Sequence, residues 1–427
     1  MENYREYKLE NGLVVALQTT PTQTIAGNLR INFGAFHEKK GEEGLAHFLE
    51  HCLVTGGSRK YNPEESDEII GNLGYLNAAT DIGKTEYQVK MIPEDLEQWL
   101  DFISDSLFNP RFDKKRVEGE RLRVLQEIRD EKSSPEYKWR ILVNKAFYRE
   151  HPGGIFVSGR EEVIKTADIG RLRDYYSRGY SVNNMDLILV GNLPKNIENL
   201  IGKYFGKQIA GENTRVIFPQ LKPLNKKTIF HISAPGLYNE ENPAESSADI
   251  SLSFVTVPDN HPNSFIIRII GNILGGSNIN SRFFKILGLE KGLAYNIYTS
   301  YDGSYNTGNF GISATIPSGR LDESINAISQ EIKRLEEGIG EDELKRCKKS
   351  LKYSIAETFD SNLECIYLIE RKLDYGLTPE FILSFFDSIT PEKVREIANK
   401  YLVSGIKNEK YVLAIRDPLK NDITNRT

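Results

Sequence analysis

The sequence predicts an α+β protein of two homologous domains, each with an antiparallel-rich mixed sheet and helices packed on one face. Three observations predict this fold class. A chain of 427 residues exceeds one ordinary hydrophobic core and suits two domains. Amphipathic helical stretches mix with alternating strands in an irregular order, unlike regular βαβ winding. Patterns of the first half also recur in the second half.

The recurrence appears in two pairs of segments. The apolar run Met185–Gly191 and the run Val412–Ile415 each follow a helical stretch. The alternating segment Thr85–Pro93 resembles Thr307–Pro317, and both end in Ile-Pro. The two pairs have the same separation along the chain to within one residue. This agreement favours duplication over the alternative, chance repetition of short helix-then-strand patterns.

A connecting segment is expected between the two copies. Residues 207–227 carry Pro219, Pro223 and several charges without clear periodicity, as a linker does. We therefore predict an N-terminal catalytic domain at residues 1–215. A homologous C-terminal domain that contributes to substrate binding is predicted at residues 216–427.

Composition excludes several classes of function. Hydrophobic residues make up 39% and charged residues 27%, which is typical of a globular protein. The net charge of -5 leaves no basic stripe for nucleic acid and gives no support for membrane binding. The N-terminal sequence resembles no signal peptide, and no apolar run reaches transmembrane length, so we expect a cytoplasmic protein. Cys52, Cys347 and Cys365 are expected in the core, since their number and spacing suit neither disulfides nor a metal site.

The segment Gly44–Thr55 is predicted to be a largely buried helix that ends at Gly56-Gly57. His47 and His51 are four residues apart, so a helix places both imidazoles on one face, where they can bind one ion. Glu50 lies beside that face. Zinc-dependent hydrolysis needs such a carboxylate to take a proton from water and pass it to the leaving amine. The alternative is a pair of core histidines satisfied by backbone groups.

Catalytic zinc usually has three protein ligands, so one more is expected from elsewhere in the chain. A charged helix that begins near Asp113 carries Glu120 and Glu127, seven residues apart on the face that also holds Val117 and Val124. One of the two glutamates could ligate and the other could support a ligand. An ordinary solvated helix explains the same charges, so the residues alone leave the choice open.

These residues resemble the inverted-zincin metallopeptidases, the family of pitrilysin, insulysin and the mitochondrial processing peptidase. His47-Phe48-Leu49-Glu50-His51 is the inverted His-x-x-Glu-His motif. Further landmarks follow in the family's order over nearly the whole chain, namely Gly44-Leu45-Ala46, Asn77-Ala78-Ala79-Thr80, Glu120 to Glu127, Leu187 to Gly191 and Gly292-Leu293-Ala294-Tyr295.

The resemblance implies roles for the remaining site residues. It implies that one zinc ion per chain is bound by His47, His51 and Glu127. Glu120 matches the family's carboxylate that orients a ligand from outside the coordination sphere. Asn77, Ala78 and Ala79 match an edge strand to which a substrate peptide adds through main-chain hydrogen bonds. Without the resemblance, Asn77 could equally be a turn residue after Gly74.

The C-terminal half departs from the family at one position. Members often carry Arg-x6-Tyr, a pair that binds the substrate carbonyl. Tyr295 matches the tyrosine, but Gly288 stands where the arginine is expected. Arg282 precedes it by one to two helical turns and does not obviously replace it. Tyr295 could also be an ordinary core residue.

Two-domain members of this length resemble half of the longer family enzymes, which implies a dimer around a chamber. The missing arginine favours a heterodimer with a related chain that carries the Arg-Tyr pair, and a homodimer is the rival. The expected function is a zinc metalloendopeptidase for short or unfolded peptides, with Glu50 as general base and Tyr295 assisting. The alternatives are a non-catalytic scaffold or partner subunit of a processing-peptidase-like heterodimer, and a metal-dependent hydrolase of another class.

Overall fold

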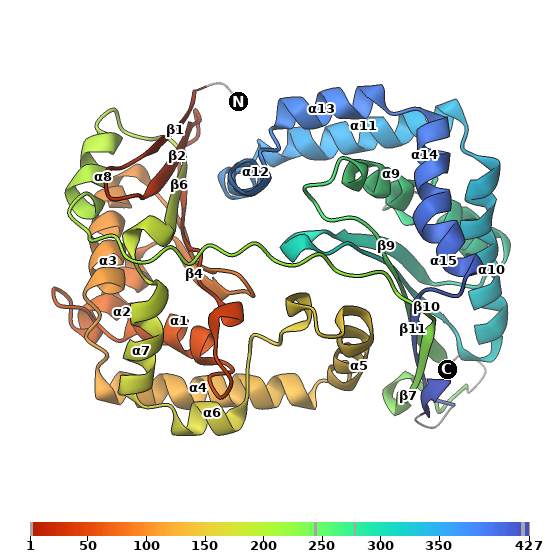
Figure 1. The fold of residues 1–427 in the computed structure, drawn as a ribbon, viewed down its shortest axis with the longest axis horizontal. Helices are drawn as coiled ribbons and strands as arrows, with labels where there is room; N and C mark the ends of the chain where they lie inside the picture. Colours follow the sequence, from red (N-terminus) through yellow and green to blue (C-terminus); the bar gives the residue numbers. More distant parts are fainter. Residues whose placement is uncertain (1–2, 243–245, 277–278, 420–422, 427) are drawn as a thin grey trace. The chain divides into compact units, whose positions relative to one another are not determined.

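The computed structural model describes residues 3–242, 246–276, 279–419 and 423–426. The chain forms two compact units, each built around one six-stranded sheet (Figure 1). The first unit comprises residues 1–133, 155–216 and 356–378, and the second comprises 134–154, 217–355 and 379–427.

The sheet of the first unit has the strand order β1-β2-β6-β3-β5-β4. β2 and β6 are parallel, and all other neighbouring strands are antiparallel. The central strands β3 and β6 are buried along their whole length, whereas β4, at one edge, alternates between exposed and half-buried residues. The strands are β1 (Tyr4–Lys8), β2 (Val14–Thr19), β3 (Ile25–Ile31), β4 (Tyr75–Thr80), β5 (Thr85–Met91) and β6 (Met185–Gly191).

Helices cover one face of this sheet, and the main core lies between them and the strands. Alternate strand residues such as Leu29, Tyr87 and Leu187 point into this core, because successive strand side chains face opposite sides. The helices of the first unit that precede the linker are α1 (Leu45–Thr55), α2 (Pro63–Asn72), α3 (Leu96–Phe108), α4 (Lys114–Ser133), α6 (Glu161–Thr166), α7 (Ile169–Gly179) and α8 (Ile197–Phe205).

The second unit repeats this topology with the strand order β12-β7-β11-β8-β10-β9. β7 and β11 are parallel, as β2 and β6 are. The strands are β7 (Thr228–Ser233), β8 (Ser247–Val255), β9 (Asn296–Asp302), β10 (Asn309–Pro317), β11 (Val412–Asp417) and β12 (Ile423–Arg426). Its helices include α9 (Asn263–Gly275), α10 (Leu321–Arg334), α11 (Glu341–Thr358), α13 (Pro379–Ser388), α14 (Pro391–Ala398) and α15 (Ser404–Lys407), with π-helical turns at Phe284–Glu290 and Asn399–Val403.

The predicted fold class is confirmed: two copies of a mixed, mainly antiparallel sheet with helices. The segments that suggested duplication are β5 with β10 and β6 with β11, which hold equivalent places in their sheets. Residues 207–227 contain no helix or strand, as a linker should. No helix among the described residues is long and apolar enough to span a bilayer.

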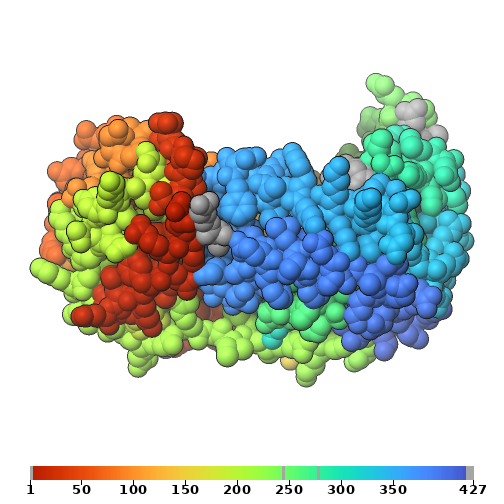
Figure 2. All heavy atoms as spheres, turned by 90° about the horizontal axis from the view of Figure 1, so that it is seen from above, coloured from red at the N-terminus to blue at the C-terminus, as the bar shows by residue number. Residues whose placement is uncertain are grey.

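The compact units differ from the predicted continuous domains in two exchanged segments. α5 (Tyr137–Tyr148) belongs to the second unit, where it packs on β7 and β11. α12 (Asn362–Tyr375) belongs to the first unit, where it packs on β3 and β6. Each exchanged helix covers the sheet face opposite the unit's other helices. In the space-filling view, the red atoms of the N-terminal residues and the yellow-green atoms of residues near 200, which are distant in the sequence but belong to the same unit, lie together (Figure 2).

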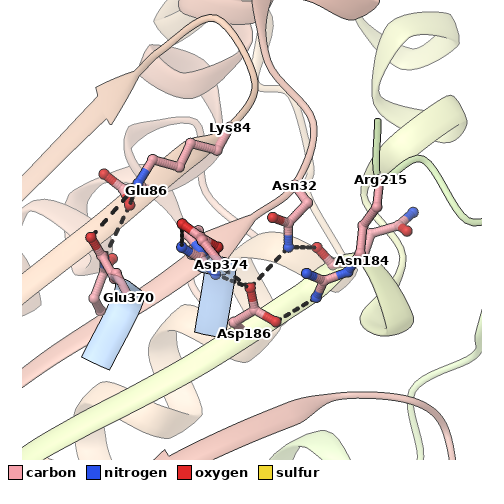
Figure 3. Close-up of polar contacts among 10 residues, drawn as sticks. Asn32, Lys84, Glu86, Asn184, Asp186, Arg215, Glu370 and Asp374 are labelled. Atoms are coloured by element: carbon pink, nitrogen blue, oxygen red, sulfur yellow. Dashed lines mark hydrogen bonds and ion pairs between the residues drawn. The ribbon is translucent and has the colours of Figure 1, made fainter. Parts of the chain in front are cut away.

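One part of the α12 interface is apolar. Cys365, Ile366 and Ile369 pack on Ala16, Ala26, Ile188 and Val190. The other part is a buried polar network at the C-terminal end of α12 (Figure 3).

In that network Arg30, whose side chain is 1% exposed, pairs with Asp186 and with Asp374 of α12. Glu370 of α12 accepts a hydrogen bond from Asn28 at 2.7 Å and lies 3.7 Å from Lys84, which also pairs with Glu86. Buried pairs of this kind add little net stability, because removing the charges from water costs about as much as their attraction returns.

Candidate metal centre

α1 presents two histidines on one side of a buried helix. Its residues Leu45, Ala46, Phe48, Leu49, Cys52 and Leu53 are buried. His47 and His51 are four residues apart, and their side chains are 19% and 11% exposed. Their Nε2 atoms lie 3.2 Å from each other. The helix period therefore brings the two imidazoles to one point, as the sequence predicted.

α4 crosses α1 and contributes the carboxylates. One side of α4 is buried and carries Val117, Val124 and Ile128. Glu127 Oε2 lies 3.6 Å from Nε2 of His47 and 3.5 Å from Nε2 of His51. Among the described residues, these three form the one group of histidines, cysteines and carboxylates that could hold a metal ion.

The three atoms have the spacing that zinc requires. A tetrahedral zinc ion with nitrogen and oxygen ligands at about 2.0–2.2 Å separates these ligands by roughly 3.3–3.6 Å. The measured separations run from 3.2 to 3.6 Å. Burial and the neighbouring His51 lower the pKa of His47 to about 4, so its ring is neutral at physiological pH. His47 Nδ1 is buried and has no hydrogen-bond partner among the described residues. Two imidazole nitrogens and one carboxylate oxygen are a donor set that zinc accepts.

Glu120, two turns before Glu127 on α4, contacts the other side of the His51 ring. Its Oε2 lies 3.0 Å from His51 Nδ1, and its Oε1 accepts a hydrogen bond from Thr55 at 3.3 Å. Burial would raise the pKa of Glu120, but these hydrogen bonds and the nearby charges of His51 and Arg123 hold it below its usual value. When His51 carries its proton on Nδ1 and donates that hydrogen bond to the ionised Glu120, the lone pair of Nε2 is free for a metal.

Glu50 lies deeper in α1 and is 6% exposed. Burial raises the pKa of this carboxyl, against the opposing charge of His51. The hydroxyl of Thr80, on β4, donates a hydrogen bond to Glu50 Oε2 at 2.9 Å. Thr80 ends the landmark Asn77-Ala78-Ala79-Thr80, but the sequence predicted no role for it. The strand period could have indicated it, because Leu76, Ala78 and Thr80 share the half-buried face of β4.

All these groups line one cavity of about 620 Å³. One wall is formed by β4, including the predicted substrate residues Asn77, Ala78 and Ala79. Asn77 is therefore a strand residue and not part of a turn. β4 pairs with β5 on one side and is the last strand of the sheet on the other. The remaining lining residues are His47, Glu50, His51, Val54, Thr55, Ile70, Leu76, Thr80, Glu120, Arg123, Glu127, Val157 and Ser158.

Tyr295 belongs to the second unit, where it immediately precedes β9. Its side chain is 75% exposed, so it is not a core residue. Gly288 lies in the π-helical turn Phe284–Glu290. Arg282 donates hydrogen bonds to both carboxylate oxygens of Glu343, at 2.9 and 2.8 Å. Arg282 therefore has a carboxylate partner within the second unit.

Comparisons with known proteins agree with this geometry. The family model described as Insulinase (Peptidase family M16) matches residues 13–159, which contain the whole proposed ligand set. The model described as Peptidase M16 inactive domain matches residues 166–351.

Two relatives and one solved structure match nearly the whole chain. The chain is 28% identical to an uncharacterized zinc protease, YmxG of Bacillus subtilis, over 98% of this chain and 99% of that protein. It is 25% identical to a probable mitochondrial-processing peptidase subunit beta of Arabidopsis thaliana, over 92% of this chain and 75% of that protein. The crystal structure of a protease from Helicobacter pylori superposes with a TM-score of 0.84 at 19% identity, over 98% of this chain and 100% of that one. This protein is therefore a two-domain member of the insulinase family, peptidase family M16.

Proposed function

We propose that the chain is a zinc-dependent endopeptidase that hydrolyses short or unfolded peptides. The observation that carries the proposal is the convergence of His47 Nε2, His51 Nε2 and Glu127 Oε2 beside the buried carboxylate of Glu50. Zinc bound there would polarise the scissile carbonyl and acidify a water molecule. Three relatives of this chain are named zinc proteases, which supports the same chemistry here.

Glu50 is proposed as the general base. Its carboxylate takes a proton from the attacking water and passes that proton to the leaving nitrogen. Burial raises its pKa, which suits a base that must hold a proton briefly. Thr80 fixes one of the two carboxylate oxygens by its hydrogen bond, so the other remains free to receive the proton.

β4 is proposed to bind the substrate backbone. Its outer edge pairs with no strand among the described residues, so its main-chain groups can form hydrogen bonds with an extended peptide. The cavity wall beside it carries Val54, Ile70 and Leu76, which can contact apolar side chains. Such binding selects extended chains and excludes folded proteins.

We further propose that the active form is a dimer. Tyr295 is exposed and available to contact a substrate, but Gly288 provides no guanidinium beside it. A related chain with an intact Arg-Tyr pair would supply that group, and the relatives named as subunits of a processing peptidase support a heterodimer. The alternative is a homodimer, in which the carbonyl of the substrate would be bound less tightly.

Cleavage of an unstructured peptide by wild type and by Glu50→Gln, with zinc content measured in both, tests the proposal. We expect about one zinc per chain in each protein and cleavage by wild type alone. Equal activity in the two proteins would remove Glu50 as the base. Zinc without cleavage in both proteins would favour the non-catalytic partner subunit.

A further inference from the structure

α1 begins at a residue that has no side chain to cap it. Gly44 precedes the first turn with a φ of 101°, in the left-handed region that favours glycine. The first N–H groups of a helix have no partner within the helix and need acceptors from outside. Here Leu45 N–H donates to Glu42 O at 2.8 Å, and the other acceptor comes from a residue further back in the chain.

That acceptor is the side chain of Glu38. Its Oε1 accepts hydrogen bonds from Gly44 N–H at 3.0 Å and from Ala46 N–H at 2.8 Å. Ala46 directly precedes His47, so the carboxyl oxygen binds the turn that carries the first proposed ligand. His51 lies one turn later, inside the hydrogen-bonded part of the helix.

Glu38 is itself held in place. It follows the short 3-10 turn Ala35–His37. The His37 ring stacks on Phe33 with centroids 4.3 Å apart, and its Nε2 lies 2.9 Å from Thr214 O. Burial raises the pKa of Glu38 to about 8, although the two helix N–H groups oppose this. At neutral pH Glu38 therefore caps the helix mainly as a neutral acceptor.

A second contact fixes the same turn. The backbone of Gly44 packs so closely on Gly159 that a Cβ on Gly159 would lie 2.2 Å from the Gly44 Cα. Val157 and Ser158, next to Gly159, line the metal cavity. The first turn of α1 is thus held by backbone contact on one side and by the Glu38 carboxyl on the other.

We infer that Glu38 is a positioning residue for the metal centre, which holds His47 in register with His51 by capping the first turn of α1. Helix ends fray when their N–H groups lack acceptors. Fraying here would move His47 and leave His51 in place, and a ligand set tolerates displacements of only about 0.5 Å. The inference rests on the proposed zinc binding at this site.

Zinc affinity, measured by competition with a chromophoric chelator, tests the inference in four variants. Glu38→Ala removes the acceptor, Glu38→Asp shortens its reach, and Glu38→Gln keeps an oxygen that can accept both bonds. The matched control is Asp168→Ala, which removes an N-cap bond of 2.8 Å to Arg171 N–H from α7 of the same unit. α7 carries no proposed ligand.

We expect Glu38→Ala and Glu38→Asp to weaken zinc binding by about tenfold, as the loss of a helix cap would. They should also alter the visible absorption spectrum of the cobalt-substituted protein. Glu38→Gln should bind zinc nearly as well as wild type. Asp168→Ala should lower Tm without changing zinc affinity or the cobalt spectrum.

Unchanged zinc affinity and an unchanged cobalt spectrum in Glu38→Ala would overturn the inference, and so would an equal loss in Asp168→Ala. If Glu38→Ala does not fold, the comparison of Glu38→Asp with Glu38→Gln decides in the same way. A wild type that binds no zinc would overturn this inference together with the proposed function. A wild type that binds zinc but cleaves no peptide removes the peptidase proposal alone, and the affinities still decide the role of Glu38.

Discussion

The hydroxyl of Thr80 donates a 2.9 Å hydrogen bond to Oε2 of Glu50. This bond joins the edge strand β4 to α1, the helix that carries two of the three proposed metal ligands, in the cavity where a peptide would bind. It holds the proposed base in one orientation and connects that base to the strand proposed to bind the substrate.

Thr80→Val should lower kcat with little change in KM, because the base loses its orienting bond while the edge of β4 remains intact. The loss of a hydrogen bond to a charged group corresponds to about 10- to 100-fold in kcat. Thr80→Ser keeps a hydroxyl and should restore most of the rate. Steady-state kinetics with zinc content measured in parallel check the prediction. A lower zinc content in Thr80→Val, or no rescue by serine, would contradict it.

Glu120→Gln should weaken zinc binding by about 10- to 100-fold, because a neutral amide orients the His51 ring less well than a carboxylate does. Competition with a chelator measures the change. Glu118→Gln is the matched control, since Glu118 is an exposed carboxylate on α4 that pairs with Arg121 instead of a histidine. Equal losses in the two variants would show that the charge of α4, and not the contact with His51, sets the affinity.

Gly288→Arg should fold and should raise kcat/KM of the purified chain if the missing guanidinium limits it. A Cβ at Gly288 would meet the carbonyl oxygen of Ala294 at 3.9 Å, an ordinary contact, so a side chain fits there. Gly288→Gln, which is long but uncharged, is the control. Peptide cleavage assays and light scattering on both variants give the result. A wild type that is already fully active as a homodimer would contradict the heterodimer proposal.

The free energy of unfolding should fall as the pH rises from about 4.5 to about 7, because of Glu370. Burial, with Glu86 nearby, raises the pKa of Glu370 to about 7 against the attraction of Lys84. An unfolded glutamate has a pKa of about 4.3. The folded state therefore binds the proton more tightly than the unfolded state. The resulting contribution to the free energy of unfolding is complete below about pH 4.3 and is lost as the pH rises through the folded-state pKa of about 7.

Glu370→Gln should remove this pH dependence and should stabilise the protein above pH 7 relative to wild type. The full shift corresponds to roughly 3–4 kcal/mol. Urea unfolding at several pH values provides the measurement. Glu364→Gln, an exposed position on the same helix, should leave the profile unchanged. A wild-type profile that is flat between pH 4.5 and pH 7 would refute the assignment to Glu370.

Local periodicity made part of this protein predictable. Thr85–Pro93 and Met185–Gly191 read as strands because of their alternation or apolar runs, and they form β5 and β6. The family resemblance pointed to Asn77–Ala79, which lie on β4. The exchange of α5 and α12 between the units could not be predicted, because an amphipathic helix shows that it has a buried face but not which sheet covers that face.

The sequence by itself determined the proposed pair of histidine ligands and the proposed base, since the helical repeat alone places His47, Glu50 and His51 around one turn of α1. Tertiary structure decided which glutamate of α4 lies at the proposed metal position and which lies behind the His51 ring. Glu120 and Glu127 are chemically identical and share a helix face, so their places depend on where α4 crosses α1. That crossing sets Glu127 beside both Nε2 atoms and Glu120 beside His51 Nδ1. The tertiary structure also decided the contacts of Thr80 and Glu38, because a hydrogen bond between two separate segments produces no periodic pattern in the sequence.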